Sequence, residues 1–361
     1  MTNRNSFFYK LKNWSLLLPV VALILVMVIN VIYDMVNGNN PLSFFTITLQ
    51  QTTSNGTILY GRIIDILNRG SEAAILAIGM TLVVSSSAGT DISVGSVMSL
   101  CASFCCMLLA GYGVSSTTEL AVPLFVGILG GLLMGAVCGM FNGTLVAFFK
   151  IQPMVATLIL FSAARAIGLL LCNDLIVYVR NPSFAFFGSF VGPLPTPLVI
   201  AAVCVAVVSL VLRKTALGMY IQSVGINSKA SRIAGLNSKR IIFLTYTICG
   251  LFAGIAGIVN SSRITSADSN NIGLYLEMDA ILAVALGGNS LGGGKFNLAG
   301  SIIGAYTIQA ITTTLYALGV SAAQAPVFKA VIVIIIVAIQ STPVRNFFKK
   351  QSAARRLKEV A

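Results

Sequence analysis

Charged residues are scarce in this chain, and histidine is missing altogether. Only 9% of its 361 residues are Asp, Glu, Lys or Arg, while 57% are hydrophobic and the mean hydropathy is +0.92. Ordinary globular domains carry about a quarter charged residues, so this composition excludes a soluble enzyme. It also excludes intrinsic disorder, which requires low hydrophobicity and high net charge. We therefore predict an all-α polytopic membrane protein.

The missing histidine also excludes two common chemistries, a His-ligated metal site and a His general base. The seven cysteines lie in apolar stretches without zinc-type spacing, as core residues do. Lys295 follows several glycines, but a phosphate loop would need Gly and Ser or Thr where Asn289 and Phe296 stand. The sequence predicts no catalytic residue, no metal site and no nucleotide site in this chain.

Long apolar runs recur along most of the chain. A helix crosses a hydrocarbon core of about 30 Å with about 20 residues. By this rule we expect about ten spans, near 14–36, 63–87, 91–111, 119–148, 153–173, 194–213, 240–262, 275–290, 298–319 and 326–342. The first run has no small-residue cleavage site after it, so we expect it to be retained. The predicted organisation is a tail 1–13, a transmembrane domain 14–342 with an inner loop 214–240, and a basic tail 343–361.

Lysine and arginine are distributed unevenly between the two sides of these spans. Ten spans place both termini on one side, and that side holds most of the 23 basic residues. The six exceptions are Arg62, Arg69, Arg165, Arg180, Arg263 and Lys329. By the positive-inside rule both termini are predicted to be cytoplasmic. This asymmetry explains the net charge of +13 without a nucleic-acid partner.

The predicted span 119–148 carries glycine at every fourth position from Gly127 to Gly143. Such a stripe lets a second helix approach backbone to backbone. It can serve packing within the chain or a subunit interface, and we favour packing within the chain. Shorter copies of the pattern are Gly250/Gly254 and Gly300/Gly304.

Runs of small polar residues at 85–91 and 287–295 interrupt the apolar pattern. Non-helical backbone at membrane depth is tolerated only inside protein or beside water, and transporters place it at their pathway. The alternative for the first run is a tight cytoplasmic turn, with Thr90 or Asp91 capping a helix from Ile92. Arg165 lies in the middle of a predicted span and is either functional or part of a buried ion pair, for example with Glu72. The predicted substrate-pathway residues are Thr90, Asp91, Ser93, Gly95, Arg165, Asn289 and Ser290.

The inner loop 214–240 contains a short helix signal. Ser228 can cap a helix over 229–234, and Gly235 can end it in the left-handed conformation. Such a helix suits docking to a protein, although flanking basic residues would also favour anionic lipid. Ala230 and Ala234, one turn apart, favour insertion into a protein cleft.

These motifs carry a family resemblance. The stretch 216–239 resembles the coupling loop of monosaccharide ABC importer permeases of the ribose-transporter type, in which a short helix docks on the ATPase subunit. Residues 89–96 are similar to that family's Gly-Ile-Asp-Leu-Ser-Val-Gly motif, with departures at Thr90 and Ile92. Within the family, the segments 150–153, 213–219, 224–227, 267–271 and 276–284 are similar to permeases of galactofuranose importers.

The resemblance implies the permease subunit of an importer for a monosaccharide, galactofuranose or a similar aldose, in the bacterial cytoplasmic (inner) membrane. It implies an ABC ATPase that holds ATP and Mg, a second and different permease, and an extracytoplasmic sugar-binding protein, with no cofactor on this chain. The implied ATPase-coupling residues are Gly225, Asn227, Ser228, Lys229, Ala230, Ser231, Arg232, Ala234, Gly235 and Leu236. The alternative function is an ion-coupled secondary transporter of a small polar solute, which would work without an ATPase.

Overall fold

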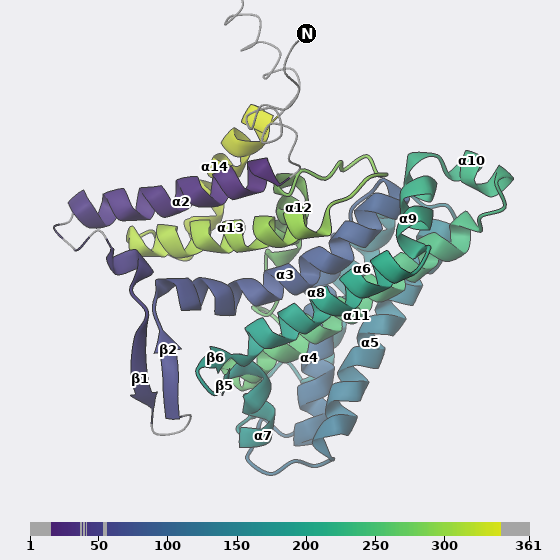
Figure 1. The fold of residues 1–361 in the computed structure, drawn as a ribbon. Helices are drawn as coiled ribbons and strands as arrows, with labels where there is room; N and C mark the ends of the chain where they lie inside the picture. Colours follow the sequence, from purple (N-terminus) through teal and green to yellow (C-terminus); the bar gives the residue numbers. More distant parts are fainter. Residues whose placement is uncertain (1–15, 37, 39, 41, 53–55, 341–361) are drawn as a thin grey trace, which may run out of the picture.

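The computed structural model describes residues 16–36, 38, 40, 42–52 and 56–340. Helices make up most of this part (Figure 1). Seven of the described helices are long and apolar enough to cross a membrane: α2 (Leu17–Val36), α3 (Arg62–Ser87), α5 (Leu124–Ala147), α6 (Pro153–Leu171), α8 (Thr196–Lys214), α11 (Ser238–Ile264) and α13 (Leu298–Ala317). Prolines stand in the first turns of α6 and α8, where the missing N–H has no intrahelical partner to lose.

Three further helices are shorter: α4 (Val94–Ala110), α12 (Leu276–Leu286) and α14 (Ala325–Gln340). Each of the ten predicted spans coincides with one of these ten helices. α12 has only 11 residues, which is about 16 Å and half of a hydrocarbon core. The fold is therefore a helical, multi-span one with at least one partial helix, and the number of ten crossings stays a prediction. The predicted tails 1–13 and 343–361 lie outside the described residues.

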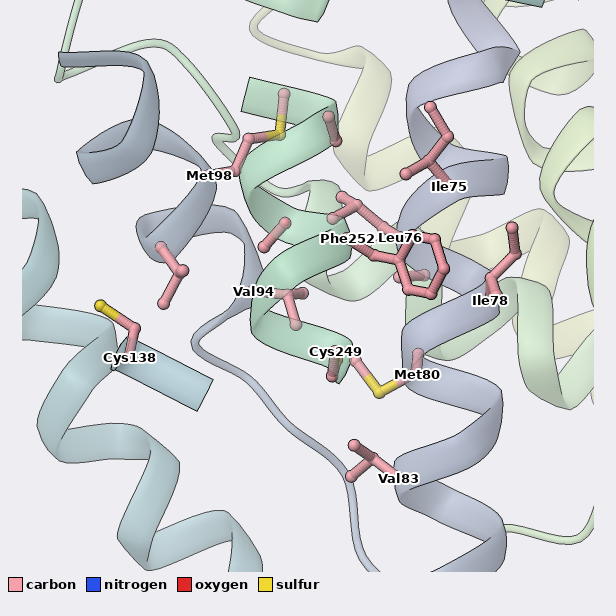
Figure 2. Packing of buried hydrophobic residues seen from close by; sticks show 14 of the residues in the cluster. Ile75, Leu76, Ile78, Met80, Val83, Val94, Met98, Cys138, Cys249 and Phe252 are labelled. Atoms are coloured by element: carbon pink, nitrogen blue, oxygen red, sulfur yellow. The ribbon is translucent and has the colours of Figure 1, made fainter. Parts of the chain in front are cut away.

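α3 is the central helix of the fold. Its most apolar window is 94% buried, whereas those of α5, α6 and α8 are only 28% buried. Figure 2 shows part of the cluster that surrounds it: Ile75, Leu76 and Ile78 of α3 are buried together with Met98 of α4 and Phe252 of α11. A helix that is apolar all round is surrounded by other elements, so α3 is enclosed by protein while the outer helices keep an exposed apolar face. All seven cysteines are buried and free, as predicted.

The glycine stripe of α5 packs within the chain, as predicted. A Cβ on Gly135 would overlap the carbonyl oxygen of Gly250 in α11, and one on Gly139 would overlap that of Tyr246. The two helices are thus in backbone contact along the stripe. Gly304 repeats the arrangement against Ala283 of α12.

Short strands form three small sheets, which an all-α prediction did not include. Strand β1 (Thr48–Thr52) pairs with β2 (Gly56–Tyr60), and β5 (Phe190–Val191) pairs with β6 (Leu194–Pro195), both antiparallel. β4 (Val177–Val179) joins β3 (Ser116–Thr117) in parallel and β7 (Ser266–Ala267) antiparallel. The N–H of Leu59 donates to the carbonyl of Pro193 at 3.1 Å, which links two of the sheets. We call this end of the bundle, which also carries α7 (Pro182–Ala185), the strand end; α9 (Leu217–Ile226) and α10 (Ser228–Ile233) lie at the other end (Figure 1).

The six basic residues outside the predicted inner loops are all engaged. Four of them form ion pairs. Arg165 donates to backbone carbonyls, and Arg180 contacts an aromatic ring. The pairs are Arg62–Asp34 at 3.0 Å, Arg69–Asp65 at 2.9 Å, Arg263–Glu72 at 2.8 Å and Lys329–Asp279 at 2.7 Å, and the Arg180 guanidinium lies 5.4 Å from the Tyr178 ring centroid. The suggested partner of Arg165, Glu72, was therefore wrong. Charge on these apolar helices is tolerated because each cation has a partner.

Candidate functional site

The short helix α10 projects from the end of the bundle opposite the strands (Figure 1). Its N-cap is Asn227, whose Oδ1 accepts the N–H of Ala230 at 3.0 Å. The predicted cap, Ser228, is instead the first helical residue, because Asn is at least as good a cap as Ser and stands one position earlier. Gly235 follows the helix with φ +88°, the predicted left-handed position.

Most residues of α10 and its flanks are exposed. Ala230 and Ala234 are exposed, and Ile233 is 90% exposed, the highest value among the large hydrophobic side chains that the structure describes. Exposed as well are Asn227, Ser228, Lys229, Arg232 and Gly235, while Gly225 and Leu236 are half-buried. An exposed isoleucine on a projecting helix offers an apolar anchor that a partner can bury. Sequence reasoning missed Ile233, although its position between Arg232 and Ala234 was within the predicted helix.

The inner face of α10 is fixed to the bundle. Ser231 is buried, and its carbonyl accepts the N–H of Leu236 at 3.0 Å. The hydroxyl of Ser238, at the start of α11, donates to the carbonyl of Ser228 at 3.0 Å. α10 is therefore hydrogen-bonded to the first turn of α11. We expect a displacement of α10 to move that helix.

Gly225, near the end of α9 and so close to α10, contacts the end of α3 and one of the two interrupted regions. We name residues 88–93 the first break and 288–297 the second break. A Cβ on Gly225 would overlap the carbonyl oxygen of Ser85 and lie 2.7 Å from the backbone nitrogen of Gly294. The N–H of Gly294 itself donates to Ser85 at 3.0 Å. The end of α3, the second break and the end of α9 thus meet at one point in backbone contact.

The first break is a turn after a complete helix. α3 has 26 residues, about 39 Å, and ends at Ala88 with φ +52°. The next helix begins at Val94, not at Ile92 as predicted. Asp91 is buried and its Oδ1 accepts both the N–H of Ser93 at 2.9 Å and its hydroxyl at 2.6 Å. The carboxylate thereby shapes the turn before α4, but the N-cap position of that helix is Ser93, so the predicted cap at Thr90 or Asp91 was wrong.

Ser93 extends this network to a third helix. Its hydroxyl accepts the Nδ2 of Asn142 in α5 at 2.8 Å. The N–H of Ile92 donates to the hydroxyl of Thr157 in α6 at 3.2 Å. Thr90 is half-buried beside these residues. The motif residues therefore hold the start of α4 to α5 and α6.

The segment 268–275, between α11 and α12, runs along α4. The hydroxyl of Ser99 donates to the carbonyl of Ser269 at 2.8 Å, and Gly273 packs against Gly95 so closely that a Cβ on either would overlap the other's carbonyl oxygen. The hydroxyl of Ser103 lies 2.6 Å from that of Ser269. Ser103 lies two helical turns after Gly95, about 12 Å along α4. Ser269, Ile272 and Gly273 of this non-helical segment are buried against protein, while Asn270, Asn271, Leu274 and Tyr275 are exposed.

Arg165 donates hydrogen bonds to the backbone carbonyls of that segment. Its Nη1 donates to the carbonyls of Ser269 at 2.5 Å, Asn270 at 2.9 Å and Ile272 at 3.1 Å. Ser269 and Ile272 are buried and Asn270 is exposed; the buried carbonyls, which have no helical partner, would be costly without a donor. The intramembrane arginine thus holds the entry to the partial helix α12.

Asn289 has the corresponding role in the second break. Its Nδ2 donates to the carbonyl of Val284 at 3.0 Å and to the hydroxyl of Ser301 at 2.8 Å, and its Oδ1 accepts the N–H of Asn297 at 2.5 Å. Ser301 is also bonded to Thr81 of α3 at 2.7 Å. The neighbouring Ser290 is exposed. The predicted pathway residues fall into two separate networks, around α4 and around Asn289, and their contact with substrate stays a prediction.

The arrangement supports movement rather than covalent chemistry. In the residues described, no group of three or more Cys, Asp or Glu could hold a metal ion. What is present is a short exposed helix, a backbone junction, a turn between two helices and a partial helix within a multi-span bundle. These features define a subunit of a membrane transport system.

Comparison with known proteins gives the family. Residues 62–339 match the family model described as branched-chain amino acid transport system/permease component. The Escherichia coli K12 galactofuranose transporter permease protein YtfT is 45% identical over 286 residues, which are 78% of this chain and 80% of its own length. The Bifidobacterium longum fructose import permease protein FruF is 37% identical over 99% of this chain and 96% of its own. The E. coli K12 ribose import permease protein RbsC is 34% identical over 82% and 90%.

The chain belongs to this family of permease components. The resemblance seen in the sequence motifs is confirmed, and the relatives are permease subunits, not enzymes. Membership indicates a multi-pass protein of the inner membrane that works with an ATPase and a substrate-binding protein. A solved metal-chelate type ABC transporter, inward-facing, has a TM-score of 0.47 at 15% identity over 89% of this chain and 96% of its own, a similarity too low to bear on the fold.

Proposed function

We propose that this chain is the permease subunit of an ATP-driven importer for a neutral monosaccharide, galactofuranose or a similar aldose. The observation that carries the proposal is α10, an exposed helix with Ile233 at its tip and Gly225 at its base. This is the arrangement needed to receive force from a soluble partner. The sugar class follows from relatives named for galactofuranose, fructose and ribose.

In this mechanism a partner ATPase binds ATP and Mg and closes on α10. Ile233 and the small side chains of Ala230 and Ala234 enter its cleft, and the strain passes through Gly225 to the end of α3 and to the second break. This chain binds no cofactor. A second, different permease completes the pathway, and a sugar-binding protein delivers substrate at the strand end.

The proposal sets the orientation of the chain. α10 is cytoplasmic, and so are both termini, while the strand end faces the binding protein. The flanking Lys229, Arg232, Lys239 and Arg240 agree with the positive-inside rule. An ion-coupled transporter is less well supported, because such a protein has no use for an exposed docking helix.

The test is uptake by the complete transporter in vesicles. Labelled galactofuranose, ribose, fructose and leucine are offered in turn, with and without ATP. We expect ATP-dependent uptake of a sugar and none of leucine, the solute class in the family description. Preferential leucine uptake would refute the sugar assignment, and ATP-independent sugar uptake would refute the coupling.

A further inference from the structure

A cavity of about 800 Å³ opens at the strand end of the molecule. Its walls come from the β1–β2 hairpin, the first two turns of α3, β5 and the outer part of α13. Among the lining residues are Gln50, Tyr60, Asp65, Asn68, Phe190 and Thr313. Small-molecule sites typically measure roughly 300–1,000 Å³. None of the residues predicted for the pathway lies in it.

The position of the cavity relates it to the docking helix. Arg62 and Asp65, at the start of α3, line it, while Ser85 near the end of the same helix contacts Gly225. The helix between them is about 39 Å long. The cavity therefore lies on the opposite face of the membrane from α10, where a solute bound for import arrives.

The charges around this cavity cancel. Arg62 is paired with Asp34 at 3.0 Å, and Arg69 is paired with Asp65 at 2.9 Å. No other Asp, Glu, Lys or Arg is among its lining residues. A neutral solute leaves both pairs intact, and a cation would meet the two guanidinium groups that line the cavity. Threonine, glutamine and asparagine side chains remain to exchange hydrogen bonds with hydroxyl groups.

Asn68 supplies a more specific sign. Its Oδ1 is buried and has no hydrogen-bond partner among the described residues. Buried polar atoms are nearly always paired, since an unpaired one is destabilising. Asn68 lines the cavity, so a rotation of its side chain would bring this oxygen to a ligand hydroxyl, which is the donor it lacks. The aromatic rings of Tyr60 and Phe190 offer apolar surface for the carbon face of a sugar ring.

We propose that this cavity is the entry site at which the permease receives a neutral monosaccharide, with Asn68 bonded to a sugar hydroxyl. The inference rests on the proposed function and assigns its substrate a place in the chain. The site is distinct from both helix breaks. It accepts the sugar before the coupling movement carries it inward.

Cysteine protection tests this assignment. All seven native cysteines are buried, so Gln50→Cys or Thr313→Cys adds one thiol reactive with an impermeant maleimide. Ser115→Cys, exposed at the strand end but outside the cavity, is the matched control. Labelling rates of the complete transporter are compared alone, with sugar-free binding protein, and with sugar-loaded binding protein.

We expect sugar-loaded binding protein to slow the labelling of both cavity cysteines at least about threefold more than sugar-free binding protein does. A site that is occupied most of the time would give such protection. The labelling rate of Ser115→Cys should be the same with either form. Equal protection by loaded and sugar-free protein would show that the cavity receives the protein itself and would overturn the proposal. So would no protection in either case. Sugar uptake by the unsubstituted transporter is measured in parallel, so that a failure here is distinguished from a failure of the proposed function.

A second variant tests the hydrogen bond. Asn68→Leu keeps the side-chain volume and removes the acceptor. We expect the uptake ratio between two neutral sugars carried by the same binding protein to change by roughly two- to tenfold, the worth of one neutral hydrogen bond. A purely structural lesion would lower both rates equally. An unchanged ratio would contradict the role of Asn68.

Discussion

The backbone N–H of Gly294 donates to the carbonyl oxygen of Ser85 at 3.0 Å, and so ties the second break directly to the last turn of α3. Gly225 packs onto the same carbonyl from α9. No side chain separates the three segments at this point. Any movement of α9 relative to α3 must therefore disturb a hydrogen bond that the second break needs.

Gly225→Ala tests this junction. Its Cβ would overlap the Ser85 carbonyl, and because the obstacle is backbone, relief requires α9 to shift. We expect the complex to assemble but to lose at least about tenfold of its substrate-stimulated ATPase and uptake, in line with overpacking costs of about 1–3 kcal/mol. Gly292→Ala, in the second break, has only the Ser290 hydroxyl at 3.5 Å and serves as the control. Normal coupling in Gly225→Ala would argue against the junction.

Ile233→Asp tests docking. Burying an isoleucine contributes about 1.5–3 kcal/mol, so replacing it with a carboxylate should weaken ATPase binding by at least about tenfold. The measurement is the amount of ATPase retained when the permease is purified from membranes. Leu175→Asp, also exposed but near the strand end, should retain the ATPase fully. Undiminished retention in Ile233→Asp would place the docking surface elsewhere.

Arg165→Leu should destabilise the fold rather than change substrate preference. It leaves the carbonyls of Ser269, Asn270 and Ile272 without their donor, at a cost of about 1–3 kcal/mol or more. Thermal denaturation of the purified complex should show a lower midpoint. Arg180→Leu, which removes only a contact with the Tyr178 ring, should change it little. A change in sugar preference without a change in the denaturation midpoint would instead support the predicted role of Arg165 in the substrate pathway.

Orientation can be measured with the same buried-cysteine background. Ser183→Cys, exposed beside α7, should react with an impermeant maleimide added to intact cells, and Ala230→Cys on α10 should react only after the membrane is opened. This follows from the positive-inside rule. Labelling of Ala230→Cys in intact cells would reverse the topology and contradict ATPase docking at α10.

The sequence was sufficient for features that depend on one local pattern. Apolar runs of about 20 residues located the helices, the Gly127–Gly143 period located a packing seam, and Gly235 ended α10 in the left-handed conformation as expected. Each is a local requirement of backbone or lipid.

Features that depend on distant partners were missed. Residues 268–271 are polar, and nothing in their own sequence indicates that Arg165 and Ser99, more than a hundred residues away, hold them against α4. The choice of Asn227 over Ser228 as cap could not be made either, since both residue types are good caps. The entry cavity gathers four separate segments, and no local pattern marks it.

The contact between α5 and α11 limits how this transporter changes shape. Side chains can rotate to let helices slide, but where Gly135 meets Gly250 and Gly139 meets Tyr246 there is only main chain on the α5 side. Those two helices are therefore expected to travel as one rigid body. α12 and α13 form a second such pair, because Gly304 meets the main chain of Ala283. Rearrangement between outward-open and inward-open states then falls to movement of one helix pair relative to the other.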